Sequence, residues 1–197
     1  SKFILSRLGV LQKRAILDKA GESFHIVSCS SLIPLKRVEI IAKSIILAAS
    51  KQANINFQWT HFGDGELRTK ILEISNTKSE NLKINLPGEV ENNKIHEYYS
   101  SEKVDLFFNF STTEGLPVSM MEAQAYGIPI LAPDIGGISE IVNEQTGFLV
   151  DVNSSILDLS KKILDISINT KELELKKKCS YENWIKNFNA ESNYKHL

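Results

Sequence analysis

The sequence predicts a doubly wound α/β domain, in which one parallel sheet is covered by helices on both faces. Short runs rich in β-branched and aromatic residues alternate with stretches whose apolar residues recur at helical spacing. This alternation is typical of right-handed βαβ units. The run Val104–Phe108 is almost continuously apolar, which favours a strand buried on both faces. The 197 residues are enough for one Rossmann-like domain over 1–197.

Six strands are predicted, each bounded by residues that favour turns. The first, Phe24–Cys29, lies between Gly21 and the pair Ser30-Ser31. Residues 1–23 are expected to hold an edge strand at Phe3-Ile4-Leu5 or to serve as a linker. The predicted strands are 24–29, 55–62, 82–86, 104–108, 128–132 and 147–150.

The stretches between the strands have helical periodicity. Leu72 is expected to face the core, and Pro117 and Gly127 are typical of a helix start and a helix stop. Breaks are predicted near Asn169 and Ser180 in the last helical region. The predicted helices lie at 38–49, around 67–74, around 95–99, at 117–126 and within 154–189.

Composition excludes several classes of protein. Lys plus Arg number 23 against 24 Asp plus Glu, so the net charge of −1 argues against a nucleic-acid partner. No apolar stretch approaches the roughly 20 residues that span a bilayer, and no signal-peptide pattern opens the chain. Cys29 and Cys179 lack CxxC spacing, which indicates a reducing compartment. We therefore expect a cytoplasmic location, at most peripheral membrane association, and neither metal nor cofactor.

Loops rich in Gly, Ser, Thr and carboxylates follow five of the predicted strands. The carboxyl ends of parallel strands share one edge of the sheet, where ligands bind. Gly63-Asp64-Gly65 is not a dinucleotide fingerprint, because Arg68 stands where the third glycine belongs. No phosphate loop, nucleophile elbow or DxD pair occurs. The candidate loops are 30–36, 63–66, 87–90, 111–117 and 133–137.

The segment Glu114 to Glu122 is the most informative of these. Pro117 suits a first helical turn, so the backbone amides just before and after it are expected at a positive helix end that favours phosphate. Glu114 is expected in the loop and Glu122 one turn inside the helix, facing one cleft. Those amides belong to Gly115, Leu116 and Val118.

The run EGLPVSMMEAQAYGIPILAPDIGGISEIVNEQTGFLV, residues 114–150, resembles the signature of the family 4 (group 1) retaining glycosyltransferases. Glu114 and Glu122 match its E-x7-E motif. Residues 24–52 resemble its strand–loop–helix with a phosphate-binding lysine. The resemblance implies one half of a GT-B fold, the C-terminal donor-binding domain, without the N-terminal domain that supplies the acceptor site.

The resemblance also implies roles for single residues. Glu122 would contact the ribose hydroxyls of the donor, Glu114 would lie near the donor sugar, and Lys36 would neutralise the diphosphate leaving group. The loop Gly88-Glu89-Val90 would contact the base. Ser30-Ser31 replaces the family's Gly-Arg, which removes one phosphate partner. The other donor-binding residues predicted are Ser31, Gly63, Gly115, Leu116, Pro117 and Val118.

The chain is therefore predicted to bind the nucleotide-sugar donor of a hexosyltransferase acting on a glycan or lipid-linked acceptor, and to be inactive by itself. Its expected partners are the donor and the N-terminal domain of the full-length enzyme. Two alternatives stay open. A non-catalytic nucleotide- or protein-binding module predicts no loss of function when Glu122 is replaced. A GT-B sugar-nucleotide epimerase would act on the donor without an acceptor.

Overall fold

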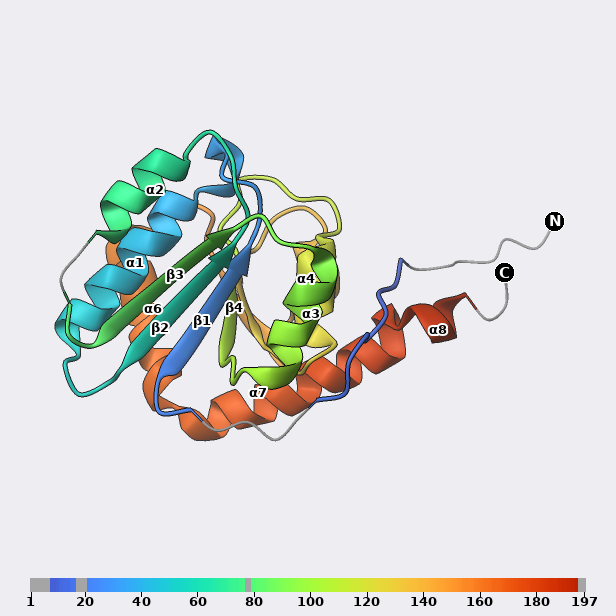
Figure 1. Cartoon of the computed structure of the whole chain (residues 1–197). Helices are drawn as coiled ribbons and strands as arrows, with labels where there is room; N and C mark the ends of the chain where they lie inside the picture. Colours follow the sequence, from blue (N-terminus) through green and yellow to red (C-terminus); the bar gives the residue numbers. More distant parts are fainter. Residues whose placement is uncertain (1–7, 17–20, 77–78, 195–197) are drawn as a thin grey trace.

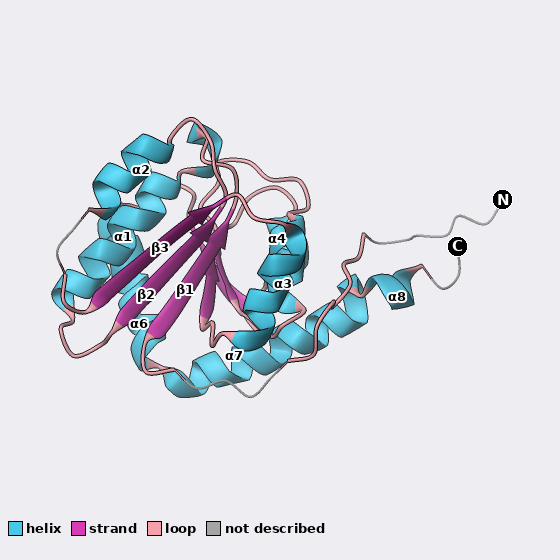
Figure 2. Cartoon of the chain, viewed as in Figure 1, coloured by secondary structure: helices cyan, strands magenta, loops and turns pink. Residues whose placement is uncertain are grey.

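The computed structural model describes residues 8–16, 21–76 and 79–194, and within them the chain forms a six-stranded sheet (Figures 1 and 2). Every pair of neighbouring strands is parallel, in the order β3-β2-β1-β4-β5-β6. The predicted doubly wound sheet is confirmed, and its order reverses between β1 and β4. The strands are β1 (Phe24–Cys29), β2 (Phe57–Phe62), β3 (Leu82–Gly88), β4 (Leu106–Phe108), β5 (Ile130–Pro133) and β6 (Gly147–Val150).

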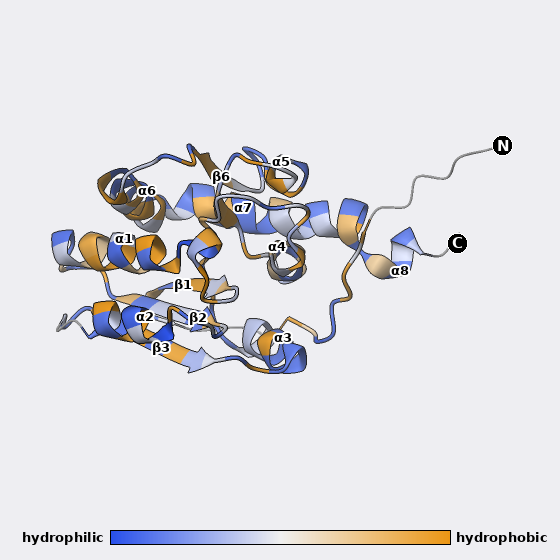
Figure 3. Ribbon diagram, turned by 90° about the horizontal axis from the view of Figure 1, so that it is seen from above, coloured by the Kyte–Doolittle hydropathy of each residue, from blue (hydrophilic) through white to orange (hydrophobic). Residues whose placement is uncertain are grey.

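Helices cover both faces of this sheet (Figure 3). The first face carries α1 (Val38–Lys51), α2 (Arg68–Ser75) and α6 (Ile156–Ile168). The second carries α3 (Asn92–Ser101), α4 (Val118–Gln124) and α5 (Ile138–Ile141). The remaining helical segments are η1 (Pro34–Lys36), α7 (Thr170–Asn183), the π-helical η2 (Trp184–Phe188) and α8 (Ala190–Asn193).

The side chains of the central strands alternate between two apolar cores. Ile26 of β1 packs into the core beneath α1 and α6, whereas Val27 packs into the core beneath α3 and α4. On β4, Leu106 and Phe108 face the first core and Phe107 faces the second. Both faces of these strands are buried, which explains why the sequence of β4 is entirely apolar, whereas β1 also buries the polar His25 and Ser28.

Two predicted element boundaries differ from the structure. The strand predicted from Val104 begins at Leu106, and the buried Asp105 before it accepts a hydrogen bond from the backbone N–H of His25 at 3.0 Å and pairs with Lys177 at 2.9 Å. The helix does not break at Ser180, whose hydroxyl donates to the carbonyl of Thr146: α7 runs to Asn183 and changes to the π-helical η2 at Trp184.

The remaining predictions for single elements concern helix α2, the break at Asn169 and the starts and ends of strands. The expected inward position of Leu72 is wrong, because Ile71 alone of α2 is fully buried and Leu72 is 46% exposed. The break at Asn169 is confirmed, and its side chain accepts from the amide of Glu172 at the start of α7. Strand β2 starts two residues later than predicted, at Phe57, and β3 extends to Gly88.

The described part of the N-terminal segment does not join the sheet. Residues 8–16 run across α3 and the C-terminal helices (Figure 1). Val10 forms an isolated parallel bridge with Asn189, and its carbonyl accepts from the Trp184 indole at 3.3 Å. Phe3-Ile4-Leu5 lies outside the described residues. In the portion of the chain that is described, no helix has both the length and the apolar character needed to cross a membrane.

Candidate functional site

The loops that follow β1 and β4 bring Lys36 and Glu114 together, although they are 78 residues apart in the chain. Lys36 ends η1, and Glu114 lies in the loop before α4. The Lys36 Nζ atom is 2.7 Å from Glu114 Oε1. The two loops are also joined by a backbone hydrogen bond from Thr112 to Leu35 at 2.9 Å. The ion pair therefore stands at the carboxyl ends of the two strands where the sheet order reverses, the expected place for a ligand.

The carboxylate of Glu114 is held ionised by three donors on one oxygen. Oε1 accepts from Lys36 at 2.7 Å, from the Ser111 hydroxyl at 2.6 Å and from the Asn109 amide at 3.2 Å. Burial favours a raised pKa for Glu114, but the hydrogen bonds and the charge of Lys36 outweigh it and lower the pKa. Lys36 keeps 26% of its side chain exposed, so the pair is not fully closed off from solvent.

Glycines of the loop after β5 support the backbone of Glu114. A Cβ on Gly136 would stand 2.0 Å from the carbonyl oxygen of Glu114, and one on Gly137 would stand 2.3 Å from that of Gly115. Gly136 also has a φ of +53°, a conformation that L-residues rarely adopt. The close packing of the two loops fixes the position of the carboxylate.

The start of α4 lies beside this carboxylate. Pro117 is the N-cap and Val118 the first helical residue. Gly115 is exposed, with no atom within 4 Å of the position that a Cβ would take, and Leu116 is half-buried. We call the loops 30–36, 63–66, 87–90, 111–117 and 133–137 the loop cluster. The segment with the predicted phosphate-binding amides lies at its surface, next to the Lys36–Glu114 pair.

The loops after β1, β2 and β3 pack closely on one another. Gly63 donates to the carbonyl of Gly88 at 2.9 Å, and a Cβ on Gly63 would stand 1.9 Å from the Ser30 carbonyl oxygen. This close approach explains why residue 63 is a glycine, without any role in binding a ligand. Ser31 and Glu89 are exposed, whereas Val90 packs against the second core. Ser31 and Glu89 are therefore the side chains of this group that solvent or a ligand reaches.

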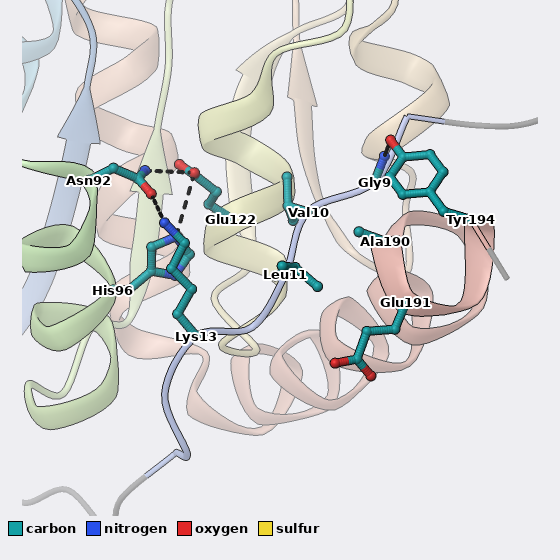
Figure 4. A pocket seen from close by; sticks show the side chains of 10 residues that line it. All are labelled: Gly9, Val10, Leu11, Lys13, Asn92, His96, Glu122, Ala190, Glu191 and Tyr194. Atoms are coloured by element: carbon teal, nitrogen blue, oxygen red, sulfur yellow. Dashed lines mark hydrogen bonds and ion pairs between the residues drawn. The ribbon is translucent and has the colours of Figure 1, made fainter.

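Glu122 lies in a separate hydrogen-bond network, on the side of α4 that faces α3. Its Oε1 accepts from the Asn92 amide at 2.8 Å and is 3.5 Å from His96 Nε2. The network borders a cavity of about 400 Å³ (Figure 4). The cavity is lined by Gly9, Val10, Leu11, Lys13, Asn92, His96, Glu122, Ala190, Glu191 and Tyr194.

The sequence did not predict two parts of this cavity. His96 and Asn92 are spaced i, i+4 on a predicted helix, which indicates a common face, but nothing in the pattern shows that this face meets Glu122. The N-terminal segment and α8 close the other side, through contacts such as Gly9 to Tyr194 at 3.1 Å. Among the residues that are described, no group of three or more His, Cys, Asp or Glu side chains is arranged to hold a metal ion.

The family model of the glycosyl transferases group 1 matches residues 11–184. The chain belongs to this family. The O-antigen biosynthesis glycosyltransferase WbnH of Escherichia coli is 35% identical over 116 residues, covering 59% of this chain and 30% of WbnH. The GtfA subunit of a Streptococcus parasanguinis peptide N-acetylglucosaminyltransferase is 24% identical over 152 residues, covering 76% of this chain and 29% of GtfA. The group 1 chain thus spans about 30% of the length of these relatives.

Solved structures give the same fold. Staphylococcus aureus TarM superposes with a TM-score of 0.72 at 23% identity, covering 98% of the group 1 chain and 37% of TarM. The C-terminal domain of a group 1 glycosyl transferase, LpcC of Francisella tularensis, superposes with a TM-score of 0.69 at 18% identity. The match covers 85% of this chain and 87% of the LpcC domain. The chain therefore has the Rossmann-like domain of GT-B glycosyltransferases.

Gly136→Ala is expected to lower the free energy of unfolding of the group 1 domain by about 2 kcal/mol or more, because the residue has positive φ and its Cβ would meet the Glu114 carbonyl. Gly115→Ala is the matched control. It places a methyl group in open space and is expected to change the free energy by less than about 0.5 kcal/mol. Urea denaturation measures both, and equal losses in the two variants contradict the prediction.

The buried His61 makes the fold sensitive to mild acid. Its Nδ1 lies 2.9 Å from the Ser28 hydroxyl, and burial lowers its pKa to about 4. Well above pH 6.5 the histidine is neutral in both states and adds no pH dependence to the stability. As the pH falls from 6.5 toward 4, the unfolded chain takes up a proton that the folded chain refuses, so stability falls.

Between pH 7 and pH 5 the loss from His61 is expected to be roughly 2 kcal/mol. His61→Gln removes this part of the loss, while His25, whose pKa burial also lowers, still contributes in the variant. Urea unfolding of both proteins at the two pH values measures the difference. A variant that loses as much stability as the wild type would show that His61 is not responsible.

Proposed function

We propose that this chain is the donor-binding domain of a retaining glycosyltransferase of family 4, which moves a sugar from a nucleoside diphosphate to a glycan or lipid-linked acceptor. The observation that carries the proposal is the Lys36–Glu114 pair at the reversal of the sheet order, 2.7 Å apart and partly exposed. A cation at that place suits a diphosphate leaving group, and a carboxylate beside it suits a sugar hydroxyl.

The relatives support a nucleotide-sugar donor. GtfA is named as a subunit of a transferase that uses UDP-N-acetylglucosamine, and the pneumococcal GtfA structure holds UDP and GlcNAc. TarM was solved with UDP. WbnH acts in O-antigen biosynthesis, which supports a glycan acceptor. UDP is therefore the first nucleotide to test on this chain.

Lys36 would stabilise the leaving group. As the bond between the sugar carbon and the phosphate oxygen breaks, negative charge grows on the diphosphate, and a fixed cation stabilises that charge most in the transition state. In this proposal the ammonium supplies the positive charge that a metal supplies in other sites. No metal is needed, and the sequence has no DxD pair to hold one.

Glu114 would position the donor rather than attack it. A carboxylate oxygen that accepts three hydrogen bonds is stabilised as an anion and is a weaker nucleophile. The three donors on Oε1 and the lowered pKa of Glu114 favour this role. Glu122, in its own network beside the cavity, would bind the ribose hydroxyls. The exposed Ser31 after β1 and Glu89 after β3, with the buried Gly88 beside Glu89, would lie near the phosphates and base.

The proposal includes a second domain and a location. An N-terminal domain would supply the acceptor site and the facing wall of the cleft. The free cysteines Cys29 and Cys179 support a reducing, cytoplasmic compartment for the enzyme.

Calorimetric titration with UDP, GDP and ADP tests the donor site. One nucleotide is expected to bind saturably. Glu122→Ala is expected to weaken it about tenfold or more, because hydrogen bonds to a charged group are lost. Lys36→Met is expected to weaken binding of the nucleoside diphosphate by a similar factor and to leave the affinity for the matching nucleoside unchanged.

Lys43→Met is the matched control, since Lys43 is exposed on α1 and lies outside the loop cluster. It is expected to leave the affinity for the diphosphate unchanged. Failure of all three nucleotides to bind contradicts the proposed donor site. An equal effect of Lys36→Met on nucleoside and diphosphate contradicts the role given to Lys36.

The chain alone is expected to release no nucleotide from UDP-glucose or UDP-N-acetylglucosamine, because one wall of the cleft is not enough to orient an acceptor or exclude water. Mass spectrometry of the reaction mixture measures this, with the titration above showing that the same protein sample binds nucleotide. Multiple turnovers by the 197-residue chain would refute this expectation.

A further inference from the structure

We propose that His96 is a positioning residue that orients the carboxylate of Glu122 toward the ribose hydroxyls of the nucleotide. This inference rests on the proposed function, because it concerns the same donor site. It adds a buried residue on α3, outside the E-x7-E motif and the loop cluster, to the set that determines affinity for ribose.

The imidazole of His96 is held from both sides. It is 1% exposed, and its two ring nitrogens face different partners. Nδ1 lies 3.0 Å from the Tyr126 hydroxyl, and Nε2 lies 3.5 Å from Glu122 Oε1 (Figure 4 shows the second contact). When the Tyr126 hydroxyl donates to Nδ1, the ring proton is on Nε2, which faces the carboxylate.

Asn92 contacts the same carboxylate from the same face of α3. It precedes His96 by one helical turn, and its amide donates to the same Oε1 at 2.8 Å. The side-chain oxygen of Asn92, Oδ1, accepts a hydrogen bond from the ammonium of Lys13 in the N-terminal segment. Asn92 is exposed whereas His96 is buried, so the histidine is the more rigid of the two contacts.

Both contacts end on Oε1, which leaves Oε2 for a ligand. A carboxylate that binds two neighbouring hydroxyls has to present a defined edge, and a glutamate on a helix surface otherwise samples several rotamers. Holding Glu122 before the ligand arrives removes that ordering cost from binding. Glu122 is only 12% exposed and borders the cavity of about 400 Å³, so its free oxygen has room for a sugar edge.

Packing alone does not explain a histidine here. A buried polar ring costs free energy unless its nitrogens are bonded, and an apolar residue of similar size fills the same space without that cost. Its neighbours Ile95 and Tyr99 on α3 already pack into the second core. The partners of both nitrogens instead point to a function at the carboxylate.

The test compares a ribonucleotide with its deoxy forms, so that ribose recognition is separated from overall affinity. The nucleotide of the UDP, GDP and ADP panel that binds the wild type is titrated beside its 2′-deoxy and 3′-deoxy counterparts. We expect the wild type to prefer the ribonucleotide about tenfold or more, a preference that Glu122→Ala abolishes.

His96→Leu is expected to reduce this preference to within about threefold of unity, whereas His96→Gln, which keeps a donor, is expected to retain most of it. Ile95→Val, a mild change in the core on the same helix, is the matched control and is expected to leave the preference unchanged. A purely structural role for His96 would weaken the ribonucleotide and its deoxy forms equally, and this result overturns the inference.

Tyr126→Phe provides a second route if His96→Leu does not fold, as judged by circular dichroism. It removes the hydroxyl that holds Nδ1 and that also contacts the backbone of Lys13 and Arg14. A selective loss of the preference for ribose supports the inference, and an unchanged preference overturns it. If the wild type binds a nucleotide but shows no preference for ribose, this inference fails and the donor site stands. If no nucleotide binds, the proposed function fails and this inference with it.

Discussion

The ion pair between Lys36 and Glu114 is the contact on which the arrangement of the site depends. Strands β1 and β4 are neighbours in the sheet but belong to the two halves of the chain, since the strand order reverses between them. The pair joins the loops that follow these strands at 2.7 Å. Because Glu114 is also fixed by Ser111 and Asn109 of its own loop, the position of the ammonium follows from the position of β4.

Close backbone packing makes this position rigid. Gly63 and Gly136 lie where any Cβ would overlap a neighbouring carbonyl oxygen, at 1.9 and 2.0 Å. The contact of Gly63 with Ser30 holds the loops after β1 and β2 together, and the contact of Gly136 with Glu114 holds the loops after β4 and β5 together. Five loops of irregular structure thereby become one surface supported by the sheet, and functional groups on rigid elements are held more accurately than those on free loops.

The fold could be predicted from the sequence because it is encoded locally, whereas the second half of the site is not. Apolar runs and turn residues are enough to locate six strands, and the roles expected for Lys36 and Glu114 come from their loops together with the resemblance to the glycosyltransferase family. Asp105 and Ser180 make buried contacts with the distant His25 and Thr146 that no local pattern reveals. Likewise Asn92 and Glu122 are 30 residues apart, and only the packing of α3 on α4 brings them together.

The two glutamates of one motif differ in their surroundings, and this difference has a consequence for binding. Glu122 faces an amide and an imidazole, whereas Glu114 already neutralises Lys36. In the proposed donor site, a diphosphate would therefore share the ammonium with Glu114, so the pair offers less net positive charge than a free lysine. In the proposed function, where Ser30-Ser31 replaces the family's Gly-Arg pair, the remaining stabilisation of the phosphate charge would come from backbone amides and from the proposed N-terminal domain. Relatives about three times longer have the chain length to supply such a wall.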